Sequence, residues 1–147
     1  MARTPFPVEV LTPEGQVFEG EVEMLSTRTE VGEIGVLANH TPLLAMLSPA
    51  DLRLHLSETE VKHFAQGEGY LQVHDNQALV LVEDCHEPDQ IDRAEQEERL
   101  RKAESVLSEA KTPADLTSAR CAQALRDKRR AETFLRIAGA GGDAGGD

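Results

Sequence analysis

The side chains best suited to acid–base chemistry are Glu33 and His40, which share one glycine-containing segment. A carboxylate and an imidazole within hydrogen-bonding reach can act as a general base and a general acid. Gly32 and Gly35 allow a tight reversal of the chain, and Pro42 forces the residue before it into an extended conformation. We therefore expect a structured loop that holds Glu33, His40 and Pro42 in a fixed arrangement.

This segment lacks the other groups that an enzyme requires. No nucleophile stands beside a base, and the sequence has no oxyanion loop, phosphate-binding loop or G-x-S-x-G turn. The sequence therefore predicts no catalytic residue. Glu33, His40 and Pro42 are interpreted instead as residues that contact another protein chain. For His40, a hydrogen bond to the local backbone is the simpler alternative.

The remaining histidines and the two cysteines do not form a metal-binding pattern. His55 and His74 fall on the polar side of alternating segments, and Cys85 and Cys121 are far apart without C-x-x-C spacing. Metal ligands in proteins usually recur at short spacings on one element. The sequence thus predicts no metal site, no cofactor site and two buried or half-buried thiols.

A cluster of positive charge near the C-terminal end consists of Arg126, Lys128, Arg129 and Arg130. Residues three and four apart are neighbours on a helix, so positions 126, 129 and 130 share one face. One interpretation is a solvated helix face, because exposed charges contribute little to stability. The other is a docking strip for an acidic partner.

Alternation of polar and apolar residues runs from Val8 to Glu83 and is clearest in residues 52–56 and 71–74. Turn signals rich in glycine, proline, asparagine and aspartate separate these segments at short intervals. Many short strands of this kind are typical of an antiparallel β-sandwich or flattened barrel. Residues 78–82 are apolar throughout, which predicts a central strand covered on both faces.

The periodicity becomes helical after Pro88. Asp89 is expected to cap a first helix, and Thr112, Pro113 and Asp115 combine a cap, a first-turn proline and a first-turn acid at the start of a second. Because the apolar faces are mostly alanine, we expect a loosely held hairpin. Such a pair of helices can be a moving, regulatory element or merely a marginally stable one.

These patterns predict a mainly β fold with added α. An N-terminal antiparallel β-sandwich or flattened barrel covers residues 1–87, and an α-helical hairpin covers 88–138. A disordered glycine-rich tail covers 139–147.

Charge and hydropathy exclude several classes of partner. The net charge is −12, and residues 1–87 hold 15 acidic against four basic side chains. Phosphate backbones would repel that part, so we expect no nucleic-acid partner. No run approaches the roughly 20 apolar residues that span a bilayer, and no apolar signal segment follows the first residues. We therefore expect a cytoplasmic chain without a transmembrane span.

Four short segments together resemble the epsilon subunit of F-type ATP synthases. They are VLTPEG at 10–15, VFEGEV at 17–22, GEIGVLANHTPLL at 32–44 and GYLQV at 69–73. The helical part also begins where the family's helical tail begins. The similarity covers roughly residues 5–137, and the order and spacing of the segments make it specific.

The resemblance implies a non-catalytic subunit of the central stalk, or rotor, of a proton-translocating ATP synthase. Such a subunit binds gamma, rests on the c-ring and couples rotation of the ring to ATP synthesis. Glu33 then lies in the loop that faces the c-ring and His40 near the gamma contact, while Phe18, Leu43 and Leu44 shape the core and the wall around the loop. The implied location is peripheral, on the cytoplasmic face of the bacterial plasma membrane.

The family's helical tail can extend along gamma and inhibit ATP hydrolysis, with basic residues against an acidic segment of the beta subunit. Arg126, Lys128, Arg129 and Arg130 match that type of position. The resemblance therefore implies that the tail contacts the beta and alpha subunits, with these four residues holding the extended state.

Some members of the family also bind ATP in the folded hairpin, through an I/L-D-x-x-R-A motif. Ile91 and Asp92 match it, but Glu95 and Gln96 replace the arginine and the alanine. A carboxylate in place of a guanidinium repels phosphate, so we expect weak or no ATP binding. The alternative function is a free-standing ligand-sensing module with a sandwich pocket and a hairpin lid, which would not co-purify with synthase subunits.

Overall fold

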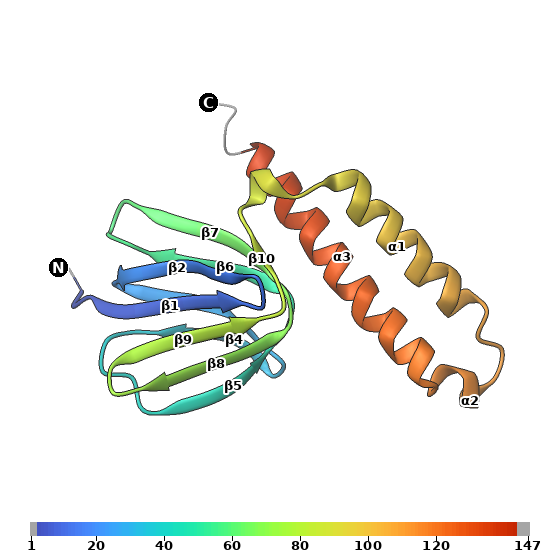
Figure 1. The fold of residues 1–147 in the computed structure, drawn as a ribbon, viewed down its shortest axis with the longest axis horizontal. Helices are drawn as coiled ribbons and strands as arrows, with labels where there is room; N and C mark the ends of the chain where they lie inside the picture. The colour runs from blue at the N-terminus through green and yellow to red at the C-terminus, as the bar shows by residue number, and fades with distance from the viewer. Residues whose placement is uncertain (1–2, 144–147) are drawn as a thin grey trace. The chain divides into compact units, whose positions relative to one another are not determined.

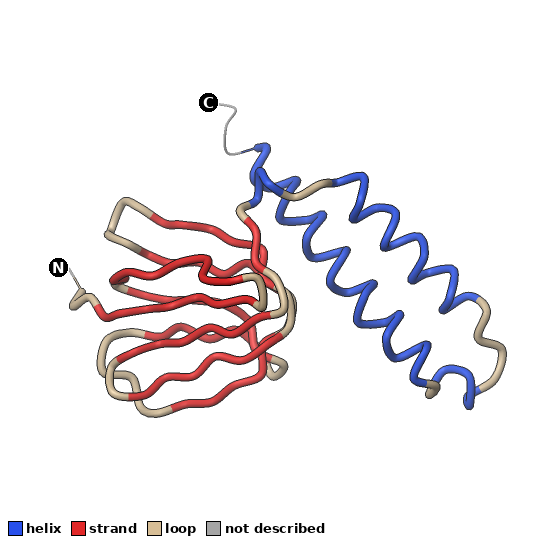
Figure 2. The backbone as a smooth tube through the Cα atoms, in the orientation of Figure 1, coloured by secondary structure: helices blue, strands red, loops and turns tan. Residues whose placement is uncertain are grey.

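The structure is a computed structural model that describes residues 3–143 of the 147-residue chain. The chain divides into two compact units, Met1–Glu87 and Pro88–Asp147. The strands belong to the first unit and the helices to the second, as the colours of Figure 2 show. Each unit is described by itself.

Ten strands make up the sheet in the described part of the first unit. They are β1 (Phe6–Thr12), β2 (Gly15–Val22), β3 (Met24–Thr29), β4 (Gly32–Val36), β5 (Leu43–Leu47), β6 (Ala50–His55), β7 (Val61–Gln66), β8 (Gly69–His74), β9 (Gln77–Val82) and β10 (Cys85–His86). Their order is β10-β7-β6-β3-β5-β8-β9-β1-β2, with β4 paired to β3. The neighbouring strands are antiparallel except for β1 and β9, which run parallel. The strands curve around one core (Figure 1), so the predicted sandwich or flattened barrel is confirmed.

The core of this unit follows from the alternation in the sequence. Successive side chains of a strand point to opposite faces, so every second residue reaches the interior. In β1 these residues are Phe6, Val8 and Val10, and in β8 they are Leu71 and Val73. The other fully buried apolar side chains include Val22, Leu25, Val36, Leu52, Leu54 and Val80.

One strand departs from its prediction. In β9, Ala78, Val80 and Val82 face the core, but Leu79 is half-buried and Leu81 is 41% exposed. The expectation that both faces of this strand are covered is therefore wrong. Its apolar sequence reflects a core face and an exposed apolar face.

The tight turn predicted at Gly32 and Gly35 lies at residues 30–31 instead. Thr29 pairs with Gly32, so a two-residue loop joins β3 to β4. Gly32 has a φ of 138°, which residues with a side chain rarely adopt, and this explains the glycine. Gly35 lies within β4, and Glu33 is on a strand.

Gln66, at the end of β7, is a fully buried polar side chain. The Thr27 hydroxyl donates to its Oε1 at 2.8 Å. Its Nε2 donates to the carbonyl oxygens of Ser48 at 3.0 Å and Gly67 at 3.3 Å. These hydrogen bonds tie β3 and β7 to the turn between β5 and β6, and they satisfy polar groups that burial would otherwise leave unpaired.

The second unit contains the short 3-10 helix η1 (Pro88–Gln90) and the α-helices α1 (Arg93–Ser108), α2 (Pro113–Leu116) and α3 (Ala119–Asp143). α1 and α3 lie side by side (Figure 1). The cap of α1 is Asp92, whose carboxylate accepts a hydrogen bond from the Glu95 N–H. The predicted cap, Asp89, lies in η1. Several carboxylates precede α1, and sequence alone does not single out the one that caps it.

The capping box predicted for the second helix is present at the start of α2. Thr112 and Asp115 exchange hydrogen bonds between side chain and backbone. The Lys111 N–H, then the side chain and N–H of Thr112, lower the pKa of the Asp115 carboxyl. α2 ends after one turn, and α3 begins anew where the Ser118 hydroxyl accepts a hydrogen bond from the Cys121 N–H.

The buried side chains of α1 and α3 are mostly small, as the alanine-rich sequence predicts. They are Gln96 and Ala103 on α1, and Cys121, Ala124, Ala131, Phe134 and Ile137 on α3. Gln96 is 6% exposed, and its Oε1 has no hydrogen-bond partner among the described residues. An unpaired buried acceptor weakens the packing of this helix pair.

The prediction of a glycine-rich tail without a fixed shape is wrong over residues 139–143. α3 continues to Asp143, so residues 139–143 are helical where the sequence predicts no fixed shape. Glycine costs about 1 kcal/mol relative to alanine inside a helix, but extending an existing helix adds one hydrogen bond per residue. Residues 144–147 lie outside the described part. None of the helices within residues 3–143 has both the length and the apolar character needed to cross a bilayer.

Candidate subunit-contact surfaces

His40 and Pro42 lie in the loop between β4 and β5. The loop opens with a β-turn, in which the His40 N–H donates to the carbonyl oxygen of Leu37 at 3.2 Å and Asn39 has a φ of 61°. A positive φ at the third residue indicates a type II turn, which favours glycine or asparagine there. His40 is half-buried, and its Nδ1 donates to the carbonyl oxygen of Thr41 at 2.7 Å. Pro42 is exposed.

Glu33 is not part of that loop. It is exposed near the start of β4, opposite Arg28 of β3. From Glu33 to Val36 the strand advances about 10 Å before the loop with His40 begins. The structure therefore does not bring Glu33 and His40 together as an acid–base pair.

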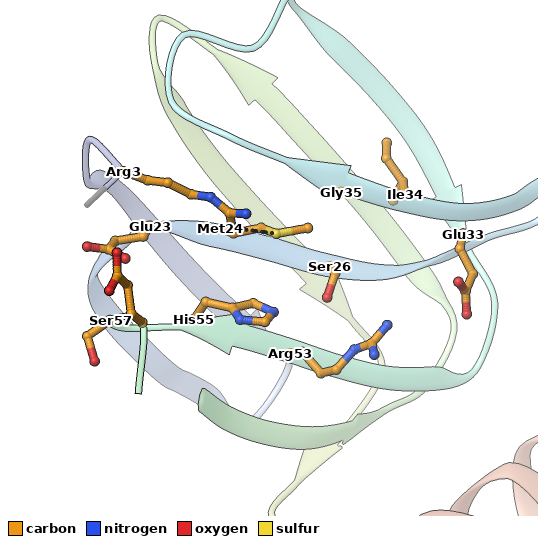
Figure 3. Close-up of a pocket in the computed structure, with 11 residues that line it drawn as sticks. Arg3, Glu23, Met24, Ser26, Glu33, Ile34, Gly35, Arg53, His55 and Ser57 are labelled. Carbon is orange, nitrogen blue, oxygen red and sulfur yellow. Dashed lines mark hydrogen bonds between the residues drawn. The ribbon is translucent and has the colours of Figure 1, made fainter. Parts of the chain in front are cut away.

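Glu33 lines a cavity of about 620 Å³ formed by β3, β4 and β6 (Figure 3). Arg53 crosses part of it, and its buried Nε lies 4.0 Å from the Asp51 carboxylate and has no hydrogen-bond partner within residues 3–143. Burial, then the positive charges of Arg53 and Arg3, lower the pKa of His55. The other lining residues are Glu23, Met24, Ser26, Ile34, Gly35, Ser57 and Glu58.

This cavity combines both signs of charge. The Ser57 hydroxyl at this cavity contacts the Thr59 hydroxyl and accepts hydrogen bonds from the N–H groups of Thr59 and Glu60. Among residues 3–143, no group of three or more His, Cys, Asp or Glu side chains is placed to hold a metal ion.

A row of exposed apolar side chains crosses the outer face of β5, β8 and β9. Met46 pairs with Tyr70, and Tyr70 pairs with Leu81. Leu44 lies on the same face of β5, and the exposed fractions are 70% for Leu44, 50% for Met46, 48% for Tyr70 and 41% for Leu81. We call these four residues the apolar row. Contiguous exposed apolar surface is a candidate for contact with another protein, a membrane or a ligand.

The apolar row is absent from the contact residues predicted from sequence. Leu44 was expected to shape the core or the wall of the loop, and it is the most exposed of the four. The signal was nonetheless present, because residues 43–47 and 78–82 are apolar at both alternating positions. A strand that is apolar on both faces either has both faces buried within the protein or presents one of them to another protein.

The same outer face becomes acidic toward β2. A groove of about 490 Å³ is lined by Glu9, Glu19 and Glu21 together with Gln72 and His74. The register places Gln72 opposite Leu79, and Leu79 opposite Glu9. The surface therefore changes from apolar at β5 to negatively charged at β2.

The predicted basic cluster does not form one patch. Arg126 and Arg129 are exposed on α3, and Arg126 donates to Gln123 Oε1 at 2.7 Å. Lys128 is half-buried and lies 3.9 Å from the Glu132 carboxylate.

Arg130 is turned toward a groove of about 440 Å³ between α1 and α3, and its guanidinium lies 4.5 Å from the centre of the Phe134 ring. Only part of the predicted cluster thus remains on the outer face of α3. Arg136 is also exposed and lies seven residues after Arg129, which places it on the same face.

Comparisons with known proteins identify the family. Residues 5–88, more than half of the chain, match the family described as "ATP synthase, Delta/Epsilon chain, beta-sandwich domain". The ATP synthase epsilon chain of Persephonella marina is 39% identical over 134 residues, which cover 91% of this chain and 96% of that relative. The chain belongs to the ATP synthase epsilon chain family. The epsilon chain of Halalkalibacterium halodurans is 36% identical over 131 residues, 89% of this chain and 90% of the relative.

Solved structures share the fold of this epsilon family member. A chain in the mitochondrial ATP synthase of Euglena gracilis, a structure of OSCP, F1 and the c-ring, matches with a TM-score of 0.73 and 18% identity. That match covers 90% of this chain and 80% of the other. A chain in the central stalk and c-ring structure of Tetrahymena thermophila mitochondrial ATP synthase matches with a TM-score of 0.59 and 17% identity, covering 92% and 98%.

The residues at the epsilon family's ATP motif serve the folded helix pair here. Asp92, which matches the motif, caps α1, and Glu95, which replaces the motif's arginine, forms an ion pair with Arg99 at 2.7 Å. Gln96 is buried. No residue at these positions offers a positive charge to phosphate, so weak or absent ATP binding remains our prediction.

Proposed function

We propose that this chain is a non-catalytic subunit of the central stalk of a proton-translocating ATP synthase. In this role it binds gamma, rests on the c-ring and couples rotation of the ring to ATP synthesis. Family membership supports the proposal, and the apolar row is the structural observation that carries it. The chain acts from the cytoplasmic face of the bacterial plasma membrane, as a peripheral subunit without a cofactor.

Coupling rotation of the c-ring to ATP synthesis requires a rigid domain that carries a surface for contact with its partners. The first unit supplies a packed core enclosed by one continuous sheet, and such interiors deform little under load. Gamma binds the apolar row and the adjacent loop with His40 and Pro42. Glu33 and the exposed hairpin between β3 and β4, which carries Val31 at 98% exposure, face the c-ring.

The helical unit has a regulatory role in this proposal. Its small buried side chains and the unpaired Gln96 oxygen make the helix pair easy to separate. Released from α1, α3 binds an acidic segment of the beta subunit, next to alpha, and inhibits ATP hydrolysis. Arg126 and Arg129 are exposed for this contact in the folded hairpin, whereas Lys128 and Arg130 become available when it opens.

The test is recovery of partners by the tagged chain from gently solubilised native membranes, followed by a salt wash and mass spectrometry. We expect gamma, alpha, beta and c subunits to remain bound. Met46→Glu should abolish their recovery, because it places a charge in the apolar row without disturbing the core. Val61→Glu is the matched control, since Val61 is 36% exposed on β7, away from the apolar row. Recovery of the wild-type chain alone would contradict the proposal and favour a free-standing sensor.

A further inference from the structure

We propose that Asn76 is a positioning residue that holds the loop containing His40 and Pro42 against the turn between β8 and β9. Asn76 Oδ1 accepts a hydrogen bond from the Asn39 N–H at 2.6 Å. The hydrogen bond between Asn39 and Asn76 is present in the structure. Its importance for binding gamma rests on the proposed function.

The Asn39 N–H is available because of the turn that contains it. In a type II turn the internal hydrogen bond runs from the fourth residue to the first, here from the His40 N–H to the Leu37 carbonyl. The third residue, Asn39, donates nothing within the turn. A side-chain acceptor from another element can therefore capture this donor.

Asn76 is equally well placed to accept. His74 pairs with Gln77, so Asp75 and Asn76 form a two-residue hairpin loop. Their φ angles of 50° and 60° fit a type I′ turn, in which asparagine, aspartate and glycine are favoured. This turn is rigid because both flanking strands belong to the sheet. Asparagine at position 76 tolerates the positive φ and also supplies an acceptor, whereas glycine would do only the first.

The sheet brings the two turns together. β5 begins at Leu43, which pairs with Val73 near the end of β8. The loop before β5 therefore emerges beside the turn after β8. Within the described part of the chain, the other hydrogen bonds of this loop join His40 to Leu37 and to Thr41. The bond to Asn76 is thus the one that anchors the loop to a neighbouring hairpin.

The consequence is a fixed orientation for the contact residues. Pro42 follows the anchored turn, and Leu44 of the apolar row lies two residues further on. With the turn held, the loop and the apolar row form one preorganised surface, and binding does not have to order the loop first. Without the anchor, the loop is free to move before it meets gamma.

The experiment compares Asn76→Gly with Asn76→Asp in the full chain. Glycine keeps the positive φ and removes the acceptor, whereas aspartate keeps both. The first readout is the water-exchange rate of the Asn39 amide measured by NMR. We expect a rise on the order of fivefold in Asn76→Gly, as for loss of one net hydrogen bond, and little change in Asn76→Asp. An unchanged rate in Asn76→Gly would overturn the anchor.

The second readout is the dissociation constant for purified gamma. We expect Asn76→Gly to weaken binding several-fold and Asn76→Asp to retain it. Asp75→Gly is the matched control, because it alters the adjacent turn position, whose carboxylate pairs with His74 at 3.1 Å. Faster Asn39 exchange with unchanged affinity would overturn the positioning role. Failure of the wild-type chain to bind gamma would overturn the proposed function itself, and the exchange measurement separates the two cases.

Discussion

The buried Gln66 side chain makes three hydrogen bonds inside the first unit. Its replacement by methionine keeps the volume but leaves the Thr27 hydroxyl and the Ser48 carbonyl without a partner. We expect the free energy of unfolding to fall by about 2–3 kcal/mol, measured by urea denaturation. Adding Thr27→Val should recover part of that loss, because the stranded hydroxyl is removed. Strictly additive effects of the two substitutions would contradict the network.

We expect His55 to make the stability of the first unit depend on pH. Burial and neighbouring arginines lower its pKa in the folded state below the ordinary 6.5. The unfolded chain therefore binds the proton more tightly, and protonation favours unfolding. The effect is absent above the ordinary pKa and grows as the pH falls through 6.5.

We expect the midpoint of thermal unfolding to drop between pH 7.5 and pH 5, and to drop less in His55→Gln. Lys62→Gln is a control on the neighbouring strand. Equal pH dependence in the wild type and His55→Gln would exclude this role for the histidine.

At the scale of single residues, the sequence predicts the effect of a residue type on its own backbone better than it predicts the contacts of its side chain. The sequence predicts one structured loop with Glu33, His40 and Pro42, but only His40 and Pro42 share a loop, and Glu33 lies on β4. The turn in that loop depends on Asn39, not on Gly32 and Gly35. The contact between Asn39 and Asn76 was not foreseen. It depends on two turns that meet only once β5 and β8 have paired.

Among the elements, the pair α1 and α3 has a specific weak point in Gln96. Gln96→Leu replaces an unpaired buried acceptor with an apolar side chain of similar size. We expect this to stabilise the helix pair by about 1 kcal/mol, seen as roughly fivefold slower amide exchange of α1 in the full chain. Gln72→Leu, at an exposed position of β8 in the first unit, is the control and should not slow exchange in α1. Faster exchange in Gln96→Leu would show that the amide is satisfied.

Short sequence motifs predict the start of a helix well when every residue of the motif is present. Thr112, Pro113 and Asp115 mark the start of α2 correctly, because a capping box acts within one turn. The sequence predicts one continuous second helix, however, and the break between α2 and α3 is missed. The cap of α1 was misplaced from Asp92 to Asp89, since several acids compete there. The exposed face of β9 was missed because an apolar run does not reveal what covers it. The orientation of Arg130 depends on which face of α3 packs, and spacing alone does not set that.

At the scale of the whole molecule, the fold and family follow from order and spacing along nearly the whole chain. The proposed contact surface required the three-dimensional register, which aligns residues of three strands into the apolar row.

The proposed inhibitory role of α3 leads to a separate expectation. Replacing Arg126, Lys128, Arg129 and Arg130 together by alanine should raise the ATPase activity of the assembled synthase several-fold. Unchanged activity would rule out that these residues hold the inhibited state.

The most direct test of the central claim is site-specific photocrosslinking in the assembled synthase, with a benzoylphenylalanine in place of Met46. The control carries the same group in place of Val61, which is also exposed but lies on β7. We predict a crosslink to gamma from position 46 and none from position 61. A crosslink to gamma from position 61 alone, or no crosslink to any synthase subunit from position 46, would contradict gamma binding through the apolar row.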